Sequence, residues 1–178
     1  MSNIDYLAIT ASGEDKIGLV QRFTSRIVEA GCNIEESRMA VLGSQFSILM
    51  LLSGPWNALT KLEDRLGHIG EELGLNIMHK RTRRAERKTP LVPYRVNVVA
   101  MDHPGIVHNL ADFFAHQGIN IEELITETYP APHTGTPMFS VNITVGVPAD
   151  MHLPTLRGDF FEYCDNLNLD AVMEPARD

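Results

Sequence analysis

Two stretches of the sequence carry the same polar residues at the same spacing, and those residues could hold a small charged molecule. An aspartate is followed three residues later by a glycine at Asp15 and Gly18, and again at Asp102 and Gly105. Glycine lets a ligand approach the backbone N–H groups of a first helical turn, where a small carboxylate or another chain can be held. The aspartate side chain can pair with an ammonium group. The spacing therefore predicts two turns with the chemistry of a small-molecule site.

Helix capping is the structural alternative for the aspartates, because Asp15 and Asp102 could accept hydrogen bonds from free backbone N–H groups at a helix start. Capping does not account for the glycines, since glycine inside a helix costs about 1 kcal/mol relative to alanine. Close packing of the helix against a strand is the structural explanation for Gly18 and Gly105. Both explanations stay open beside ligand binding.

An asparagine follows the glycine that ends each repeated helix, at Asn33 and at Asn120. Asparagine is common in turns, so each could be a plain turn residue, but its recurrence with the aspartate and the glycine favours binding. Pro104 stiffens the second turn, so we expect the better site there, with His103 lining it. The candidate ligand-binding residues are Asp15, Gly18, Asn33, Asp102, His103, Gly105 and Asn120.

Catalytic and metal-binding patterns are missing from the sequence. The acidic pairs Glu35–Glu36 and Glu122–Glu123 lie on expected strands, where neighbouring side chains point to opposite faces. His103, His108 and His116 stand five and eight residues apart, which is not the spacing of a helical ligand pair. No Ser-His-Asp order, phosphate loop or dinucleotide fingerprint is present. We expect no catalytic residue, no metal ligand, no cofactor and no enzyme activity.

Charge is spread unevenly along the 178 residues. The formal net charge is −8, yet six of the fifteen basic residues lie in the run Lys80–Lys88, and outside it nine basic residues face twenty-two acidic ones. Such an acidic surface repels phosphate backbones, so direct nucleic-acid binding is not expected unless the run carries it. The run is either a solvated strand end and linker or a docking patch for an acidic partner or nucleic acid.

Compartment signals favour the cytoplasm. The two cysteines, Cys32 and Cys164, lie in different halves and form no metal-like or redox pair, so we interpret both as small buried hydrophobic residues. No apolar run is long enough to span a bilayer, and the first residues do not resemble an export signal. We therefore expect a cytoplasmic protein without a membrane partner.

The turns must be positioned by strands and helices, and the first half predicts six of them. Leu19, Phe23, Ile27 and Ala30 fall on one face of a helix that Gly31 ends, and a second helix carries leucines at spacings of three and four until Gly74. Gly43 lies between two strands that form a hairpin. The expected strands are 6–12, 32–43, 45–54 and 75–82, and the second helix is 56–74.

The second half repeats this order after a linker in which Pro90 and Pro93 are expected to exclude regular structure. Its first helix is expected to bury Val107, Leu110, Ala111 and Phe114. About six additional residues, rich in proline, lengthen its hairpin. The expected strands are 94–101, 119–129, 138–147 and 167–174, and the helices are 104–117 and 152–166.

The βαββαβ order predicts, twice, a four-stranded antiparallel sheet with both helices on one face, an α+β ferredoxin-like fold. With the D-x-x-G turn and the G-x-N-I-E-E motif, each half resembles an ACT domain. We assign ACT domain 1 to residues 1–84, a linker to 85–93 and ACT domain 2 to 94–178. In amino-acid-binding members the resemblance implies a site at the turn between the first strand and first helix, often completed by a neighbouring domain. Many such members carry asparagine where this chain has Asp15 and Asp102, and a carboxylate there would repel a ligand carboxylate.

A tandem pair of ACT domains that is not attached to an enzyme domain resembles the transcriptional repressors of this family. The resemblance implies a non-enzymatic regulator that senses a small amino acid, with glycine the expected ligand, and represses transcription through a DNA-binding activator. The alternative is a protein-interaction module with vestigial ligand sites. The two halves could pair into one eight-stranded sheet, or each could pair with another chain in a homodimer.

Overall fold

The computed structural model describes residues 4–84 and 90–176. The chain divides into two compact units, Met1–Glu86 (unit 1) and Arg87–Asp178 (unit 2), and the division falls inside the predicted linker. Residues 85–89 of that linker, and with them Arg87 and Lys88 of the basic run, lie outside the described residues.

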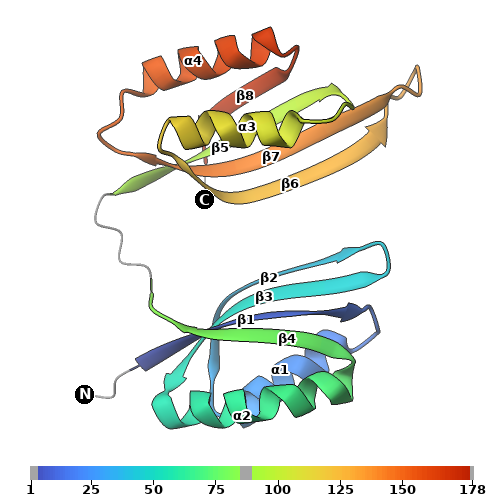
Figure 1. The fold of residues 1–178 in the computed structure, drawn as a ribbon, viewed down its shortest axis with the longest axis vertical. Helices are drawn as coiled ribbons and strands as arrows, with labels where there is room; N and C mark the ends of the chain where they lie inside the picture. The colour runs from blue at the N-terminus through green and yellow to red at the C-terminus, as the bar shows by residue number, and fades with distance from the viewer. Residues whose placement is uncertain (1–3, 85–89, 177–178) are drawn as a thin grey trace. The chain divides into compact units, whose positions relative to one another are not determined.

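Unit 1 is one antiparallel sheet with two helices on one face (Figure 1). The sheet has the strand order β2-β3-β1-β4, and each helix connects two strands. The elements are β1 (Ile4–Glu14), α1 (Leu19–Glu29), β2 (Asn33–Leu42), β3 (Gln45–Pro55), α2 (Trp56–Leu73) and β4 (Leu75–Thr82).

Unit 2 has the same topology, with the strand order β6-β7-β5-β8 and both helices on one face (Figure 1). The predicted fold of two ferredoxin-like βαββαβ units is confirmed. The elements are β5 (Leu91–Met101), α3 (Ile106–His116), β6 (Asn120–Pro130), β7 (Pro137–Pro148), α4 (Leu153–Asn166) and β8 (Asp170–Pro175).

Strand β5 begins earlier than the sequence indicated. Pro93 lies within it, opposite Gly146 of β7, so the prediction that Pro93 excludes regular structure is wrong. A proline lacks only the backbone N–H, and the Pro93 carbonyl still accepts a hydrogen bond from the Ala176 N–H (2.9 Å). Leu91 to Pro93, expected in the linker, are therefore the first residues of the strand.

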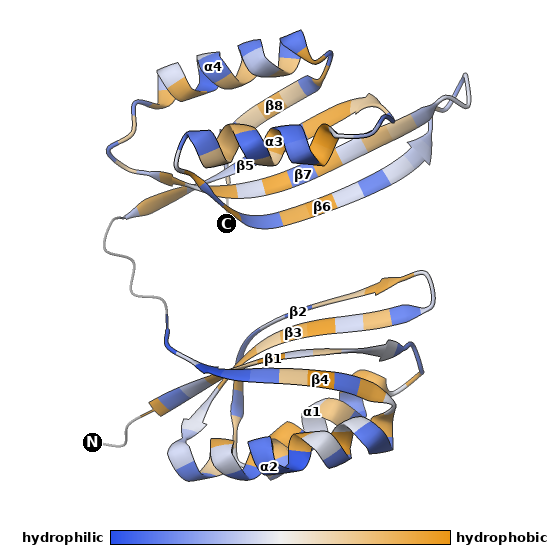
Figure 2. Ribbon diagram, viewed as in Figure 1, coloured by the Kyte–Doolittle hydropathy of each residue, from blue (hydrophilic) through white to orange (hydrophobic). Residues whose placement is uncertain are grey.

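The core of unit 1 lies between the sheet and the apolar faces of α1 and α2. Every residue predicted to face inward from α1 is buried, and so are the leucines that α2 carries at spacings of three and four. Figure 2 shows these helices alternating between hydrophobic and hydrophilic residues, as amphipathic helices do. Gly31 and Gly74 have positive φ angles (82° and 70°), which confirms the predicted helix ends.

The core of unit 2 departs from the prediction at α3. Ile106 and Phe113 are buried with Leu110 and Phe114, whereas Val107 and Ala111 are only partly buried. The helix face is turned toward α4 because the Phe113 ring packs on Phe160 and Tyr163 of that helix, each with a centroid separation of 5.2 Å. No helix among residues 4–84 and 90–176 is both long and apolar enough to cross a membrane.

Candidate ligand-binding turns and a cavity at the opposite end

The turn of unit 1 connects β1 to α1 and lies beside the β2–β3 hairpin. The Asp15 N–H donates to the Ser44 carbonyl (3.0 Å), and the Leu19 N–H donates to the Lys16 carbonyl (3.1 Å). Gly18 is the N-cap of α1, and no side chain caps that helix. Capping by Asp15 is therefore wrong, because the chain makes a further turn before the helix begins. The Asp15 side chain is exposed.

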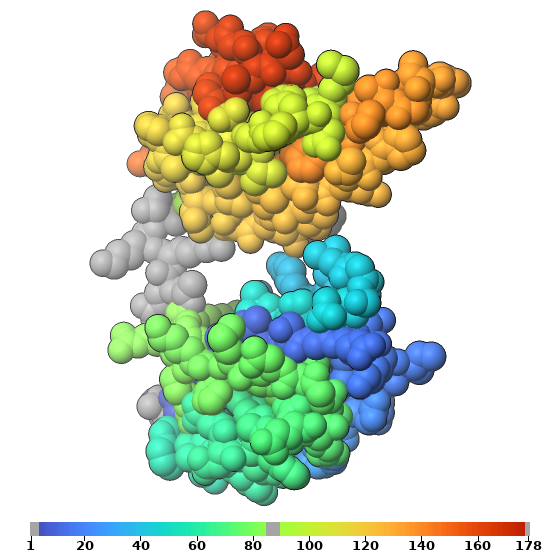
Figure 3. Space-filling view, turned by 45° about the vertical axis from the view of Figure 1, so that its right-hand side comes forward, coloured from blue at the N-terminus to red at the C-terminus, as the bar shows by residue number. Residues whose placement is uncertain are grey.

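The turn of unit 2 has the same geometry between β5 and α3. The Asp102 N–H donates to the Pro137 carbonyl (2.9 Å), and Gly105 is the N-cap of α3, again without a side-chain cap. The exposed His103 lies in this turn, where its Nδ1 N–H donates to the Pro104 carbonyl (3.1 Å). The longer hairpin next to this turn projects from unit 2 (Figure 3).

Both N-cap glycines adopt the left-handed conformation, with φ of 81° at Gly18 and 96° at Gly105. That conformation accounts for glycine without a ligand, because side chains with a Cβ rarely adopt it. The space beside the turns is nevertheless open. In the described part of the chain, a Cβ on Gly18 would meet no atom within 4 Å, and one on Gly105 would meet only the Asn109 amide nitrogen at 3.9 Å.

The two asparagines lie at the other end of their sheets. Asn33 pairs with Ser53 near the end of β3, and Asn120 pairs with Gly146 near the end of β7. The 11-residue helix α1 separates Asn33 from the unit 1 turn by about 16 Å. The structure therefore brings Asp102, His103 and Gly105 together and Asp15 with Gly18, but it does not bring either asparagine to the turn of its own unit.

The motif after each asparagine forms a β-bulge, which the sequence reasoning missed. The register of β2 shifts between Ile34 and Glu36, and that of β6 shifts between Ile121 and Glu123. In each bulge the first glutamate of the pair is the additional residue inserted into the ladder. The N-I-E-E sequence, which occurs in both units, is the feature from which the two bulges could have been predicted.

The bulge glutamate of unit 1 is fixed by two hydrogen bonds. Glu35 Oε1 accepts from Ser53 Oγ (2.5 Å) and from Asn33 Nδ2 (3.3 Å). The Ser53 hydroxyl, and after it the Asn33 amide, hold the pKa of the Glu35 carboxyl below its usual range. Glu35 is therefore a carboxylate at neutral pH.

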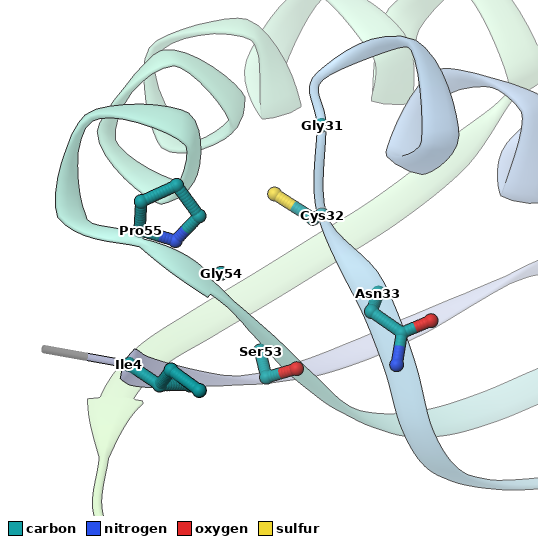
Figure 4. A pocket seen from close by; sticks show the side chains of 7 residues that line it. All are labelled: Ile4, Gly31, Cys32, Asn33, Ser53, Gly54 and Pro55. Atoms are coloured by element: carbon teal, nitrogen blue, oxygen red, sulfur yellow. The ribbon is translucent and has the colours of Figure 1, made fainter. Parts of the chain in front are cut away.

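A cavity of about 450 Å³ lies between the start of β2 and the end of β3 in unit 1 (Figure 4). Cys32 and Asn33 line it from β2 and the preceding loop, and Ile4 lines it from the start of β1. Ser53, Gly54, Pro55 and Gly31 complete the lining. Among the residues that the structure describes, no group of three or more potential metal ligands gathers here or elsewhere.

Both cysteines are buried, as predicted. Burial raises the pKa of the Cys32 thiol, and burial raises the pKa of Cys164 to about 12. A thiol with a raised pKa is a poor nucleophile, so neither residue is suited to covalent chemistry.

Part of the basic run has a structural role. The Arg81 guanidinium donates to Glu63 Oε2 from two nitrogens (2.7 and 3.0 Å) and to the Thr60 hydroxyl (2.9 Å), which ties β4 to α2. Lys80, Arg83 and Arg84 are exposed. The run is therefore not a uniform basic surface.

Comparison with known proteins shows which family has this architecture. A family model for the ACT domain matches residues 5–80, within unit 1. The glycine cleavage system transcriptional repressors of Escherichia coli (strain K12) and Shigella flexneri are each 37% identical to this chain over 168 residues, which cover 94% of this chain and 88% of theirs.

Among the crystal structures that match nearly the whole chain, two share its fold at TM-scores above 0.7. One is of a protein provisionally assigned as a glycine cleavage system transcriptional repressor, with 29% identity and a TM-score of 0.75, covering 99% of this chain and 100% of that one. The other is of an unknown protein from Galdieria sulphuraria, with 26% identity and a TM-score of 0.78, covering 98% and 100%. The chain belongs to the tandem ACT-domain family of glycine cleavage system transcriptional repressors.

Proposed function

We propose that this protein is a non-enzymatic cytoplasmic regulator that senses a small amino acid, glycine first among the candidates, and represses transcription by contacting a DNA-binding activator. The observation that carries this function is the likeness to a glycine cleavage system transcriptional repressor over 94% of the chain. The acidic surface supports action through a protein rather than through direct contact with DNA.

We assign the principal ligand site to the turn of unit 2. The exposed Asp102 carboxylate pairs with the ligand ammonium, and the first N–H groups of α3 receive the ligand carboxylate. Pro104 and the hydrogen bond from Asp102 to Pro137 hold this turn in place before a ligand binds. Asn120 stays a prediction, and its contact with the same ligand requires a further ACT domain, such as one from a second copy of the chain.

Titration calorimetry with a panel of amino acids tests the site. Asp102→Ala is expected to weaken binding of the preferred amino acid by about 10- to 100-fold, because it removes one charge-assisted hydrogen bond. Asp150→Ala, an exposed aspartate in the loop before α4, is the matched control and should leave the affinity unchanged. Absence of heat with every amino acid, or equal affinity for Asp102→Ala and the native chain, would contradict the assignment.

A pure interaction module is the second candidate, and one observation favours it. The positive φ angles of Gly18 and Gly105 explain both glycines by backbone conformation alone. Capture of the DNA-binding activator on the immobilised chain, with and without glycine, separates the two functions. A sensor changes the amount captured when glycine is added, whereas a module with vestigial sites captures the same amount.

A further inference from the structure

The cavity of unit 1 has an apolar wall and a polar rim, and it lies at the other end of the sheet from the ligand-binding turn. The wall includes Ile4, Cys32 and Pro55, and the rim includes Asn33 and Ser53. An apolar concavity with a few converging polar groups is the usual form of a small-molecule site.

Hydrogen bonding at the rim uses donors and leaves acceptors. Ser53 donates its only hydroxyl hydrogen to Glu35 Oε1, and Asn33 donates one of its two amide hydrogens to the same oxygen. The Asn33 carbonyl oxygen, the Ser53 oxygen lone pairs and the second Glu35 oxygen can then accept hydrogen bonds, whereas the second Asn33 amide hydrogen is the one side-chain donor that the rim retains. Acceptors therefore outnumber donors at this rim, which favours a ligand that supplies donors.

The charges around the rim favour a cation. Glu35 is ionised, and no lysine, arginine or histidine is among the residues that line the cavity. The Arg81 guanidinium, on the helix-covered side, is paired with Glu63, although its charge also acts on the Cys32 thiol in the wall. Among residues 4–84 and 90–176, the charge of Arg84 acts on Glu35 from outside the lining, and it would compete with a bound cation.

Unit 2 fills the corresponding position. The register of the strands places Ile119 where unit 1 has Cys32, and Val147 where it has Gly54. Gly146 replaces Ser53, and a Cβ there would lie 2.8 Å from both Leu91 Cδ1 and Glu122 Oε1. The ACT fold therefore does not require this space to be open, and unit 1 has the smaller side chain at two of these positions, Cys32 and Gly54.

We propose that the cavity of unit 1 binds a primary amine with a short unbranched apolar tail, with the ammonium group at Glu35, Asn33 and Ser53 and the tail against Ile4, Cys32 and Pro55. This site is separate from the turn site in position, and it prefers a cation, whereas the turn site receives an amino acid that carries both charges. A free metabolite and a lysine side chain of another protein both present this chemistry.

The test uses the full-length chain and three four-carbon probes, n-butylammonium, n-butanol and butyrate, followed by backbone amide NMR shifts. n-Butylammonium is expected to shift the amides of Cys32, Asn33 and Gly54 in a saturable manner, butanol at least 10-fold more weakly, and butyrate not at all. Nα-acetyl-lysine methylamide is the fourth probe. Tighter binding of this lysine derivative than of n-butylammonium identifies a protein lysine as the source, and weaker binding identifies a free amine.

Three variants sharpen the test. Glu35→Gln keeps the shape of the rim and should lower n-butylammonium affinity about 10-fold or more. Gly54→Val introduces the residue that unit 2 has at this position. A Cβ on Gly54 would make ordinary contacts (3.6 Å to Leu59 Cγ), so the variant should fold. Its methyl groups are expected to fill the cavity and abolish binding. Arg84→Ala should strengthen binding. Shifts that do not saturate, equal affinity for butanol and n-butylammonium, or full binding by Glu35→Gln would overturn the proposal.

Discussion

The two ACT units have the same order of strands and helices but different interiors. In unit 2 the helices meet through aromatic rings, with Phe114 and Phe113 at 5.4 and 5.2 Å from the Phe160 ring. In unit 1 the large buried residues of the helices are leucines and isoleucines with a single ring, Phe23, and the ion pair Arg26–Glu72 joins the helices at the surface. The same fold is therefore compatible with two kinds of core, provided that each helix keeps one apolar face.

The uncovered faces of the two sheets also differ. On the central strands of unit 1 this face carries Ala8, Leu49 and Leu51, and the corresponding positions of unit 2 are Arg95, Asn142 and Thr144. By contrast, both units retain the glycine N-cap and the bulge glutamate, where the backbone departs from regular geometry. Local backbone geometry is thus shared between the units, while side-chain chemistry at the surfaces has changed.

Removing the central ring of unit 2 should have the largest effect. Phe160 is fully buried, so Phe160→Ala is expected to lower the free energy of unfolding of this unit by about 3 to 5 kcal/mol. Amide hydrogen exchange of the whole chain in urea, followed on proteolytic peptides from 4–84 and from 90–176, reports the stability of each unit separately. Leu62→Ala is the matched change in unit 1, and it should destabilise the peptides of unit 1. A loss below about 1 kcal/mol for Phe160→Ala would show that the ring cluster does not hold unit 2 together.

The two cysteines should differ in their rates of alkylation. With a pKa of about 12, Cys164 has so little thiolate near pH 8 that it should react about 1,000-fold more slowly than in the unfolded chain. Cys32 is 7% exposed against 1% for Cys164, so it should react first. Mass spectrometry of iodoacetamide-treated Cys32→Ser and Cys164→Ser variants measures each thiol alone. Equal rates for the two thiols would contradict the difference in burial.

The N-cap glycines should respond alike in both units. Gly18→Ala and Gly105→Ala each place a Cβ on a left-handed residue, which is expected to cost about 1 to 2 kcal/mol of unfolding free energy although the space is open. Gly158→Ala in α4 is the control with ordinary φ, and it should stabilise unit 2 by up to about 1 kcal/mol. Urea denaturation of the three variants distinguishes strain from crowding. A neutral Gly105→Ala would remove the conformational explanation for glycine.

The fold could be predicted from the sequence because the periodicity of Leu59 to Leu73 and the glycine stops at Gly31 and Gly74 are local signals. The inward face of α3 was partly wrong because contacts with α4, distant in sequence, turn Phe113 inward in place of Val107. Tertiary packing of this kind is not encoded in helical spacing alone.

The candidate site was predicted less well than the fold. The turns at Asp15 and Asp102 were found, but their aspartates do not cap, because the left-handed φ of the next glycine cannot be read from spacing. The separation of Asn33 from Gly18 was available from the length of the intervening helix. The bulge at Glu35 and the cavity beside it depend on which residue β3 places opposite, and a single strand does not carry that information.

The smallest effect concerns Ser53, for which unit 2 has Gly146. Ser53→Gly removes the hydrogen bond that contributes most to the lowered pKa of Glu35, so the pKa of that carboxyl should rise toward its ordinary value. A carboxyl with a lowered folded-state pKa stabilises the fold above its unfolded pKa, and this contribution is lost as the pH falls through the folded pKa. The native chain should therefore be more stable than Ser53→Gly at neutral pH, and the pKa-linked part of that difference should vanish in acid. Carbon-13 NMR titration of the Glu35 carboxyl in the native chain and in Ser53→Gly measures the shift. An unchanged Glu35 titration in Ser53→Gly would mean that the bulge alone positions the carboxylate and that the serine does not distinguish the two units.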